Sequence, residues 1–562
     1  MEIANPIDHK KQSSLYLAII ILSGLVFFIP FLGRAHLFDW DEINFAESAR
    51  EMIVTGNYHR VQINFLPFSE KPPLFFWLQA AAMHVFGINE FAARFPNAVL
   101  GIITLVTFFL IGKKYKSPRF GFIWAISYLG TFLPHVYFKS AIIDPVFNYF
   151  IFLGIFFMYK DSLPHYRRGA GKYLYVSLAG LFIGLGTLTK GPVALLVFLL
   201  VFLVYFILKR FKDFPGIKKM LCFTFFFTAV CLFWFGPEIM ENGFWFLKEF
   251  LSVQADLFLH PVASHGEPFY YHFVVVFIGC FPISIIALPV FFRKDKGAHS
   301  NFLRIMKILF WTVMILFTLS TTKIVHYSSL TYMPLAFLAT VYLDTLLDKQ
   351  AKMNKWMRAL ILFMGFIFSF LLSALPYVAN HHQLLLPYLK DPFAVASLNV
   401  SVNWRGFESL IGIGYFIGVL AAVWLFSRKK NRTAIALLFY STAVCLFIYM
   451  LSVVPRIEQY SQGPAIRFYE SLQGKDVYVW PVGFRSYAQY FYAKKPASPV
   501  YGEADQEFLL KGKITRPAFF VVKVTNSGFD STCHGCTLIK QEGGFKFYKR
   551  EVPSALPGRE RS

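Results

Sequence analysis

The sequence predicts a polytopic α-helical membrane protein with a small α/β domain at its carboxyl end. Hydrophobic residues make up 56% of the 562 residues and charged residues only 15%, whereas an ordinary soluble domain carries about 25% charged residues. Long apolar runs recur as far as residue 453 and then stop. The first run, 15–31, lies where a signal peptide would, but it has no small-residue cleavage site and more runs follow it, so we expect it to remain as an anchor.

We expect about thirteen membrane-spanning helices, because about 20 apolar residues in a helix are needed to cross the hydrocarbon core of a bilayer. In chain order they lie near 15–33, 92–112, 119–136, 141–159, 173–189, 191–208, 219–236, 269–291, 304–320, 328–346, 356–378, 408–426 and 433–453.

Basic residues gather in the loops on one side of these spans. They occur at 9–11, 113–116, 167–168, 209–219, 293–294, 349–358 and 428–430. Because positively charged loops stay in the cytoplasm, we expect a cytoplasmic amino terminus and, after an odd number of spans, an extracytoplasmic tail, as in a protein of the bacterial inner (plasma) membrane. The same pattern accounts for the net charge of +23, so nucleic acid is not an expected partner.

The composition changes near residue 455 and divides the chain into a membrane domain, 1–454, and a soluble α/β domain, 455–562. In the second domain 475–480, 518–524 and 544–548 have the pattern of short buried strands, and 464–472 that of a helix. The membrane domain carries three long extracytoplasmic loops, at 38–90, 237–268 and 379–407.

Two of the six cysteines, Cys533 and Cys536, lie in the soluble domain. A local disulfide is the simplest interpretation, since extracytoplasmic compartments permit oxidation. A zinc site needs more ligands, haem attachment needs a different residue order, and a redox role is the alternative.

Charged residues follow the first span unusually closely, in the runs 38–52 and 68–74. Ionisable groups next to lipid are costly and are usually kept for function. Together with other charged residues at predicted outer span ends they come from six parts of the chain. This set is Asp41, Glu42, Glu70, Lys71, Asp144, Lys190, His265, Glu267 and Lys323. Each one alone could be a solvated helix end, but together they predict one polar cavity at the outer leaflet.

These residue types suit the transfer of a sugar from a lipid-linked phosphate. Lysines next to the phosphate neutralise the charge that develops as it leaves, and a carboxylate can take a proton from the attacking hydroxyl. A polytopic lipid or solute transporter is the alternative from a different class. It predicts ionisable residues or Gly/Pro breaks near the middle of the membrane, and the middles of these spans are nearly free of charge.

Three motifs in the amino-terminal part of the chain resemble those of the dolichyl-phosphate-mannose protein mannosyltransferase superfamily (GT-C, glycosyltransferase family 39 type). They are the Asp-Glu-x-x-x-Ala-Glu-x-x-Arg-Glu-Met run at 41–52, the Glu-Lys-Pro-Pro-Leu-x-x-Trp-Leu run at 70–78, and Phe-Ala-Ala-Arg-Phe-Pro at 91–96. Within the superfamily, the chain is most similar to the bacterial aminoarabinose (ArnT-like) transferases that modify lipid A. Shorter motifs at 143–145, 188–192, 265–271 and 322–327 extend the resemblance.

The resemblance implies a GT-C fold, a polyprenyl-phosphate sugar donor, inversion at the anomeric carbon, and a lipid, glycan or protein acceptor in the cell envelope. A protein O-mannosyltransferase-like enzyme is the alternative within the same class. One departure concerns the substrates: aminoarabinose transferases usually carry arginine and tyrosine where this chain has Asn44 and Phe45.

The resemblance also implies roles for single residues. It gives Asp41 and Asp144 as catalytic residues, and Lys71 with Tyr327 as contacts to the donor phosphate. From the charged set at the span ends we add Glu42 to the catalytic candidates and Lys190 and Lys323 to the phosphate contacts. Glu70 and His265 match candidate ligands of a divalent metal such as zinc. Two protein ligands make a poor zinc site, so we do not expect a metal to be required.

Overall fold

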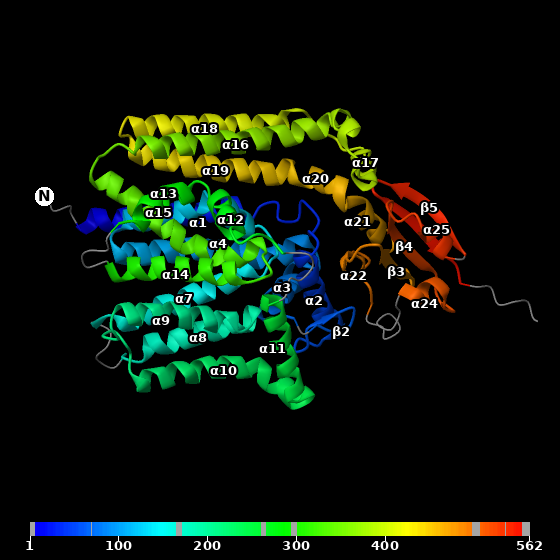
Figure 1. Ribbon diagram of the computed structural model, residues 1–562, viewed down its shortest axis with the longest axis horizontal. Helices are drawn as coiled ribbons and strands as arrows, with labels where there is room; N and C mark the ends of the chain where they lie inside the picture. Colours follow the sequence, from blue (N-terminus) through cyan, green and yellow to red (C-terminus); the bar gives the residue numbers. More distant parts are fainter. Residues whose placement is uncertain are drawn as a thin grey trace, which may run out of the picture.

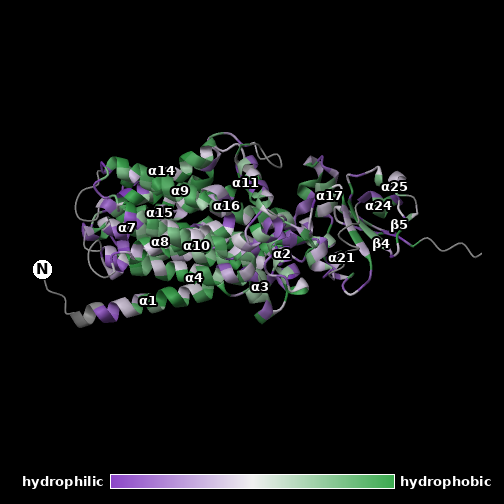
Figure 2. Ribbon diagram, turned by 90° about the horizontal axis from the view of Figure 1, so that it is seen from below, coloured by the Kyte–Doolittle hydropathy of each residue, from purple (hydrophilic) through white to green (hydrophobic). Residues whose placement is uncertain are grey.

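The computed structural model describes residues 6–68, 70–164, 171–259, 266–293, 300–496, 506–533 and 535–552. It is a bundle of long helices with a small sheet domain at one end (Figure 1). Hydrophobic residues cover most of the bundle, and hydrophilic residues gather around α2 (Asp41–Thr55) and at the ends of the helices (Figure 2).

All thirteen predicted spans coincide with helices. They are α1 (Pro6–Phe28), α4 (Glu90–Tyr115), α5 (Pro118–Leu129) with α6 (Phe132–Tyr137), α7 (Asp144–Ser162), α8 (Leu174–Lys190), α9 (Val193–Leu208), α10 (Ile217–Asn242), α12 (Tyr271–Gly279) with α13 (Ile283–Phe291), α14 (Ser300–Leu319), α15 (Tyr332–Asp348), α16 (Lys355–Asn380), α18 (Leu410–Ser427) and α19 (Asn431–Ser452).

The number of membrane crossings stays a prediction. Within the described residues, eight helices are long and apolar enough to span a membrane, and α12 with α13 make a ninth if this pair, bent by 116°, is one span. The bend lies next to Pro282, which has no backbone N–H to continue a helix. The helices α8 and α9 are apolar but shorter.

Small residues allow the helices of the bundle to approach each other closely. A Cβ atom added at Gly112 of α4 would lie 2.6 Å from the Cα atom of Gly121 in α5. One added at Gly180 of α8 would lie 2.3 Å from the carbonyl oxygen of Phe223 in α10. Such contacts are typical of membrane helices, whose association depends on packing rather than on the hydrophobic effect.

All three predicted long loops contain helices at the end of the bundle that carries the sheet domain (Figure 1). In the loop 38–90 these are α2 and α3 (Leu74–Phe86), with a hairpin of β1 (Gln62–Ile63) and β2 (Leu66–Pro67) between them. In the loop 237–268, α10 continues to Asn242 and α11 (Phe244–Leu259) then turns across the ends of the bundle helices (Figure 1). The loop 379–407 contains the short helix α17 (Pro392–Leu398).

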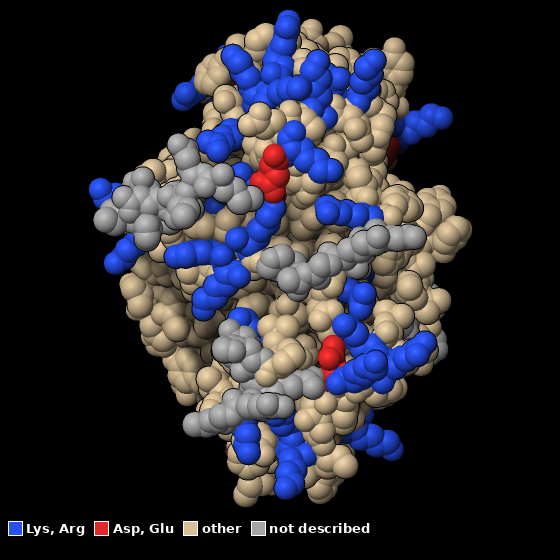
Figure 3. All heavy atoms as spheres, turned by 90° about the vertical axis from the view of Figure 1, so that its left-hand side faces the viewer, with Lys and Arg blue, Asp and Glu red and all other residues tan. Residues whose placement is uncertain are grey.

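The opposite end of the bundle is strongly basic. Lysine and arginine side chains spread over this face, and few acidic groups are visible among them (Figure 3). Lys116 and Arg119 pair here with Asp344 and Asp348, which ties α4 and α5 to α15. The basic loops and the sheet domain therefore lie at opposite ends, as the sequence predicts, and the assignment of the basic end to the cytoplasm stays a prediction.

The carboxyl-terminal part forms a four-stranded sheet in the order β3-β4-β6-β5. The three predicted strands are β3 (Tyr478–Val482), β4 (Ala518–Lys523) and β6 (Phe545–Arg550), with β3 parallel and β6 antiparallel to β4. The edge strand β5 (Cys536–Glu542) was not predicted, because its exposed residues lack the pattern of a buried strand. Cys533 and Cys536 form the expected disulfide.

Short helices connect this sheet to the bundle. The helix α20 (Val454–Ser461) follows directly from α19, and α21 (Gly463–Glu470) confirms the helix expected near 464–472. After the first strand come α22 (Ala488–Tyr492), α24 (Gln506–Lys511) and α25 (Phe529–Thr532). We call residues 455–552 the carboxyl-terminal domain; the division of the chain at 455 stays a prediction.

Candidate active site

A cavity of about 60 Å³ lies among the ends of α7, α8 and α9, the end of α14 and the short 3-10 helix η2 (Val325–Thr331). Its polar lining residues are Lys71, Asp144, Asn148, Lys190, Gln254, His326 and Tyr327. The other walls are apolar and consist of Phe147, Val193, Val197, Phe317 and Leu330. The cavity therefore combines a charged region with a hydrocarbon-like surface.

Asp144 and Lys190 form an ion pair inside this cavity. Asp144 begins α7, Lys190 ends α8, and their Oδ1 and Nζ atoms lie 2.6 Å apart. The Lys190 ammonium also lies 5.5 Å from the ring centre of Tyr327, within cation–π distance. The side chain of Asp144 is only 4% exposed, so this lysine compensates a carboxylate that would otherwise be buried alone.

Lys71 reaches the same cavity from the loop before α3. Its ammonium donates one long hydrogen bond, 3.4 Å, to the carbonyl oxygen of Glu70, and no carboxylate of the described residues lies at ion-pair distance. Burial lowers the pKa of Lys71 and the positive charge of Lys190 adds to this, while Glu70, Asp41 and Asp144 oppose it. A half-buried cation with so little compensation is a suitable place for an anion.

Asp41 lies at the outer side of the site, at the first residue of α2. His326, which lines the cavity, lies with Nε2 3.5 Å from the Asp41 carboxylate and with Nδ1 3.0 Å from the hydroxyl of Tyr137. His326 is not among the site residues predicted from the sequence. The available signal was its place in the 322–327 motif, directly before Tyr327.

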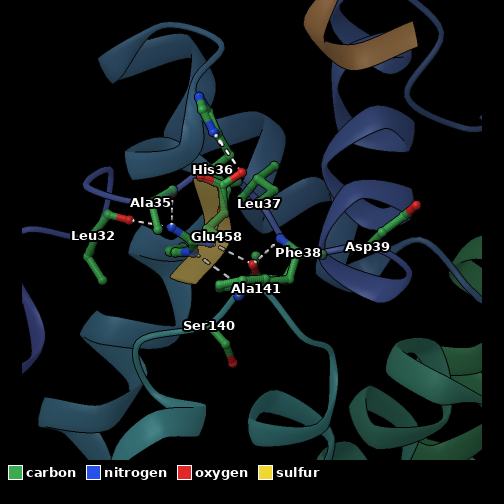
Figure 4. A network of polar contacts seen from close by, with 12 residues as sticks. Leu32, Ala35, His36, Leu37, Phe38, Asp39, Ser140, Ala141 and Glu458 are labelled. Carbon is green, nitrogen blue, oxygen red and sulfur yellow. Dashed lines mark hydrogen bonds and ion pairs between the residues drawn. The ribbon is translucent and has the colours of Figure 1, made fainter. Parts of the chain in front are cut away.

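Glu42, by contrast, points away from the cavity. Its carboxylate accepts two hydrogen bonds from Arg94, at 3.0 and 2.7 Å, and one each from the backbone N–H groups of Phe38 and Ala141. Arg94 in turn donates to the carbonyl oxygens of Leu32, Ala35 and His36. Figure 4 labels the residues whose backbone groups make these contacts: Leu32, Ala35, His36, Phe38 and Ala141. The expectation that Glu42 shares one cavity with the other charged residues was therefore wrong.

Lys323 is also outside the cavity lining. It is buried, and its ammonium donates to the carbonyl oxygen of Ser320 at 2.8 Å. Of the charged residues predicted to share one cavity, Lys71, Asp144 and Lys190 line it together with Tyr327, and Asp41 lies beside it through His326. Glu42 and Lys323 instead bond to the surrounding backbone.

The candidate metal ligands do not form a metal centre in the part of the chain that the structure describes. Glu70 and Glu267 are exposed, and the Glu70 carbonyl oxygen accepts a hydrogen bond from Gln254 at 2.9 Å. His265 lies outside the described residues. Among those residues no group of three or more His, Cys, Asp or Glu side chains could hold a metal ion, so Glu70 alone gives a metal no sufficient ligand set.

Comparison with known proteins supports this description. The sequence model of the dolichyl-phosphate-mannose-protein mannosyltransferase family matches residues 70–237. The crystal structure of ArnT from Cupriavidus metallidurans bound to undecaprenyl phosphate superposes with a TM-score of 0.75, at 16% identity, over 97% of this chain and 99% of that one. The chain has the GT-C fold of ArnT.

Curated relatives carry a consistent name. The undecaprenyl phosphate-alpha-4-amino-4-deoxy-L-arabinose arabinosyl transferase of Edwardsiella ictaluri is 26% identical over 352 residues, 61% of this chain and 62% of the relative. A Proteus mirabilis protein of the same name, numbered 1, is 28% identical over 58% of each chain. The chain therefore spans about three fifths of the length of these two relatives. The resemblance to the mannosyltransferase superfamily and to ArnT-like enzymes is confirmed.

Proposed function

We propose that the protein is an integral-membrane glycosyltransferase that moves a sugar from a polyprenyl-phosphate donor to an acceptor at the outer face of the membrane. The observation that carries this proposal is the cavity in which a poorly compensated Lys71 and the Lys190–Asp144 pair meet an apolar wall. A lipid phosphate combines the same two properties, an anionic head and a hydrocarbon chain.

In this proposal the side chains that line the cavity have separate roles. Lys71 and Lys190 neutralise the phosphate, Tyr327 lies beside Lys190, and Phe147, Val193 and Val197 give the prenyl chain an apolar surface. As the bond between the anomeric carbon and the phosphate oxygen breaks, its electron pair stays on that oxygen. The two ammonium groups stabilise the developing charge, which is the main form of catalysis that fixed charges supply.

The acceptor oxygen attacks the anomeric carbon from the face opposite to the leaving phosphate, so the configuration is inverted. Asp41, 39% exposed and next to His326, is in a position to take the proton of an acceptor hydroxyl. If the acceptor oxygen is already anionic, as in a phosphate group, no base is needed and Asp41 instead orients the sugar.

The relatives favour undecaprenyl phosphate as the carrier, because it is the lipid named in their reaction and the ligand in the ArnT structure. The acceptor is a lipid, a glycan or a protein; the family match includes enzymes that act on proteins. Since Asn44 and Phe45 replace the arginine and tyrosine usual in aminoarabinose transferases, we leave the sugar open. We place the protein in the bacterial inner membrane, with a cytoplasmic amino terminus.

Transfer of an isotope-labelled sugar tests this function. The full chain, purified in detergent, is incubated with undecaprenyl-phosphate sugars and with cell-envelope lipids, glycans or proteins, and labelled product and released undecaprenyl phosphate are measured. We expect equal amounts of both, and neither with an Asp144→Asn variant. Movement of an intact donor or solute across proteoliposomes without cleavage of the sugar–phosphate bond would favour a transporter instead.

A further inference from the structure

The segment before Asp41 is held by side chains that lie more than 400 residues later in the chain. Leu37 is fully buried and belongs to no helix or strand. Its backbone N–H donates to the hydroxyl of Tyr492 at 2.7 Å, and its carbonyl oxygen accepts from the side-chain amide of Gln462 at 2.7 Å. The same Gln462 accepts a hydrogen bond from the Asp39 N–H at 3.4 Å.

One ionic and one aromatic contact extend this connection to the residues on either side, His36 and Trp40. His36 Nδ1 lies 3.1 Å from a carboxylate oxygen of Glu458 in α20, a contact that Figure 4 draws between their labelled side chains. The ring of Trp40 packs on that of Tyr487 with 4.9 Å between centroids. Four of the five residues before Asp41 thus contact the carboxyl-terminal domain: His36, Leu37, Asp39 and Trp40.

Trp40 is also tied to the helix that follows it. With its side-chain amide in the orientation that satisfies both partners, Asn44 donates to the Trp40 carbonyl oxygen at 3.0 Å and accepts from the indole N–H at 2.7 Å. The contact from Tyr487 is therefore transmitted to the first turn of α2, where Asp41 lies.

The start of α2 also contacts the membrane bundle, through Glu42. Glu42 connects the start of α2 to Arg94 and to the Ala141 N–H, and neither contact includes the carboxyl-terminal domain. A backbone segment without its own secondary structure needs partners for its N–H and C=O groups. At Leu37 and Asp39 those partners come from Gln462 and Tyr492, while the N–H of Phe38 donates to Glu42.

We propose that the carboxyl-terminal domain is a positioning element of the active site, and that Gln462 and Tyr492 are positioning residues that hold Asp41 over the cavity. The domain then has a part in the transfer step without touching the donor. The inference rests on the proposed function only for its effect on turnover. The contacts that fix residues 36–40 can be measured separately, by hydrogen exchange.

Two variants remove these contacts. Tyr492→Phe removes only the hydroxyl that accepts the Leu37 N–H, and Gln462→Ala removes both contacts of the amide. The matched control is Trp404→Phe. It removes a 2.8 Å hydrogen bond to Tyr460 at the same junction of bundle and domain, without contacting residues 36–40.

The first measurement is amide hydrogen exchange of a peptide covering 36–41, in the full chain in detergent. In each variant one backbone N–H loses its acceptor, that of Leu37 in Tyr492→Phe and that of Asp39 in Gln462→Ala. We therefore expect exchange about tenfold faster in each variant and no change in Trp404→Phe. Exchange equal to the wild type in both variants would overturn the proposal. This measurement does not require a known acceptor, so it remains decisive if the wild type transfers no sugar and the proposed function fails.

The second measurement separates positioning from folding. We expect kcat to fall while KM for the donor and binding of undecaprenyl phosphate stay at the wild-type level, because Gln462 and Tyr492 do not line the cavity. Variants that exchange faster but keep the wild-type kcat would overturn the positioning role. A parallel loss of undecaprenyl phosphate binding would overturn it as well, since it would mean general loss of structure.

Discussion

Three lysines near the end of the bundle that carries the carboxyl-terminal domain differ in what compensates their charge. Lys190 is paired with Asp144, Lys323 donates to the carbonyl oxygen of Ser320, and Lys71 has only a 3.4 Å contact to a carbonyl oxygen. In the sequence all three stand at predicted span ends and look alike. Because Lys71 has the least compensation, it gains most from a bound phosphate.

Replacing Lys71 therefore tests the phosphate site most directly. A charge-assisted contact contributes about 1.5–3 kcal/mol, so Lys71→Ala should weaken binding of undecaprenyl phosphate about tenfold to a hundredfold and reduce turnover at least as much. The measurement is titration with undecaprenyl phosphate in detergent. Lys248→Ala, at an exposed lysine of α11, is the control and should bind normally. Wild-type affinity in Lys71→Ala would leave this lysine as a structural charge.

Asp41 is expected to act on the acceptor or on the donor sugar. Asp41→Asn preserves size but removes charge and basicity, so transfer should fall at least about 10²-fold if the carboxylate is a general base. The pH profile of turnover separates the two roles: a base gives an acidic limb that the asparagine variant loses. Glu249→Gln, an exposed acid on α11, is the control. Unchanged transfer by Asp41→Asn would exclude both roles.

Glu42 should respond in a different way, because its carboxylate holds three backbone regions together. It pairs with Arg94 and accepts from the N–H groups of Phe38 and Ala141. Ala141 lies three residues before Asp144, so this one side chain connects the segments that carry the two aspartates of the site.

We predict that Glu42→Gln destabilises the protein as well as reducing transfer. Removing one partner of a buried ion pair costs about 3–5 kcal/mol because the other charge is left uncompensated. Thermal unfolding in detergent should show a clearly lower midpoint for Glu42→Gln, whereas Asp41→Asn should unfold like the wild type. Loss of transfer at an unchanged midpoint would return Glu42 to the catalytic candidates.

At the residue scale, the sequence could identify which segments supply the site but not which way each side chain points. Asp41 and Glu42 are adjacent in one motif, yet only Asp41 faces His326 and the cavity side. The direction depends on where the first turn of α2 begins and on Arg94, 52 residues away. His326 was missed although it lies in the 322–327 motif, because its contacts with Asp41 and Tyr137 are made across the fold and cannot be read from the motif.

At the scale of elements, predictability followed the apolar pattern. Runs of about 20 apolar residues predicted every bundle helix, because a lipid environment requires internally bonded backbone. The helices α2, α3 and α11 were placed in loops, since α2 is polar and α3 and α11 are shorter than a membrane span. The edge strand β5 has an exposed face without alternation and was therefore missed.

The contact between α20 and the segment before α2 should depend on pH. Burial lowers the pKa of His36, but the hydrogen bond and charge of Glu458 and the charges of Glu90 and Glu470 outweigh it and raise the pKa above 6.5. The Tyr492 ring and Arg94, which donates to the His36 carbonyl oxygen, also face it. A raised histidine pKa means that the stabilisation is complete below pH 6.5 and is lost as pH rises through the folded-state value.

We therefore expect residues 36–40 to lose protection from hydrogen exchange as pH rises above about 6.5, after correction for the intrinsic exchange rate. The pH-dependent part should disappear in His36→Gln, which keeps a polar side chain but cannot ionise. The control is the peptide at 404–410, whose Trp404 contact to Tyr460 includes no histidine. Protection that is constant with pH in the wild type would contradict the ionic role of His36.

At the scale of the whole molecule, the two ends of the bundle have different tasks. One end carries the cavity, α2 and the carboxyl-terminal domain, and the other carries the basic loops (Figures 1 and 3). The sequence could predict this separation from the alternation of loops. It could not predict that residues 458–492 pack on residues 36–40, because no local pattern encodes a contact over such a distance.

The two ends of the bundle should lie on opposite sides of the membrane. Because basic loops remain in the cytoplasm, the carboxyl-terminal domain and residues 38–73 should both be extracytoplasmic. Single cysteines at two exposed positions test this in intact cells: Ser471→Cys beside α21, and Lys352→Cys in a basic loop. The background lacks the native cysteines. A membrane-impermeant maleimide should label position 471 directly and position 352 only after permeabilisation. The reverse pattern would place the cavity at the cytoplasmic face, where an outer-leaflet acceptor cannot reach it.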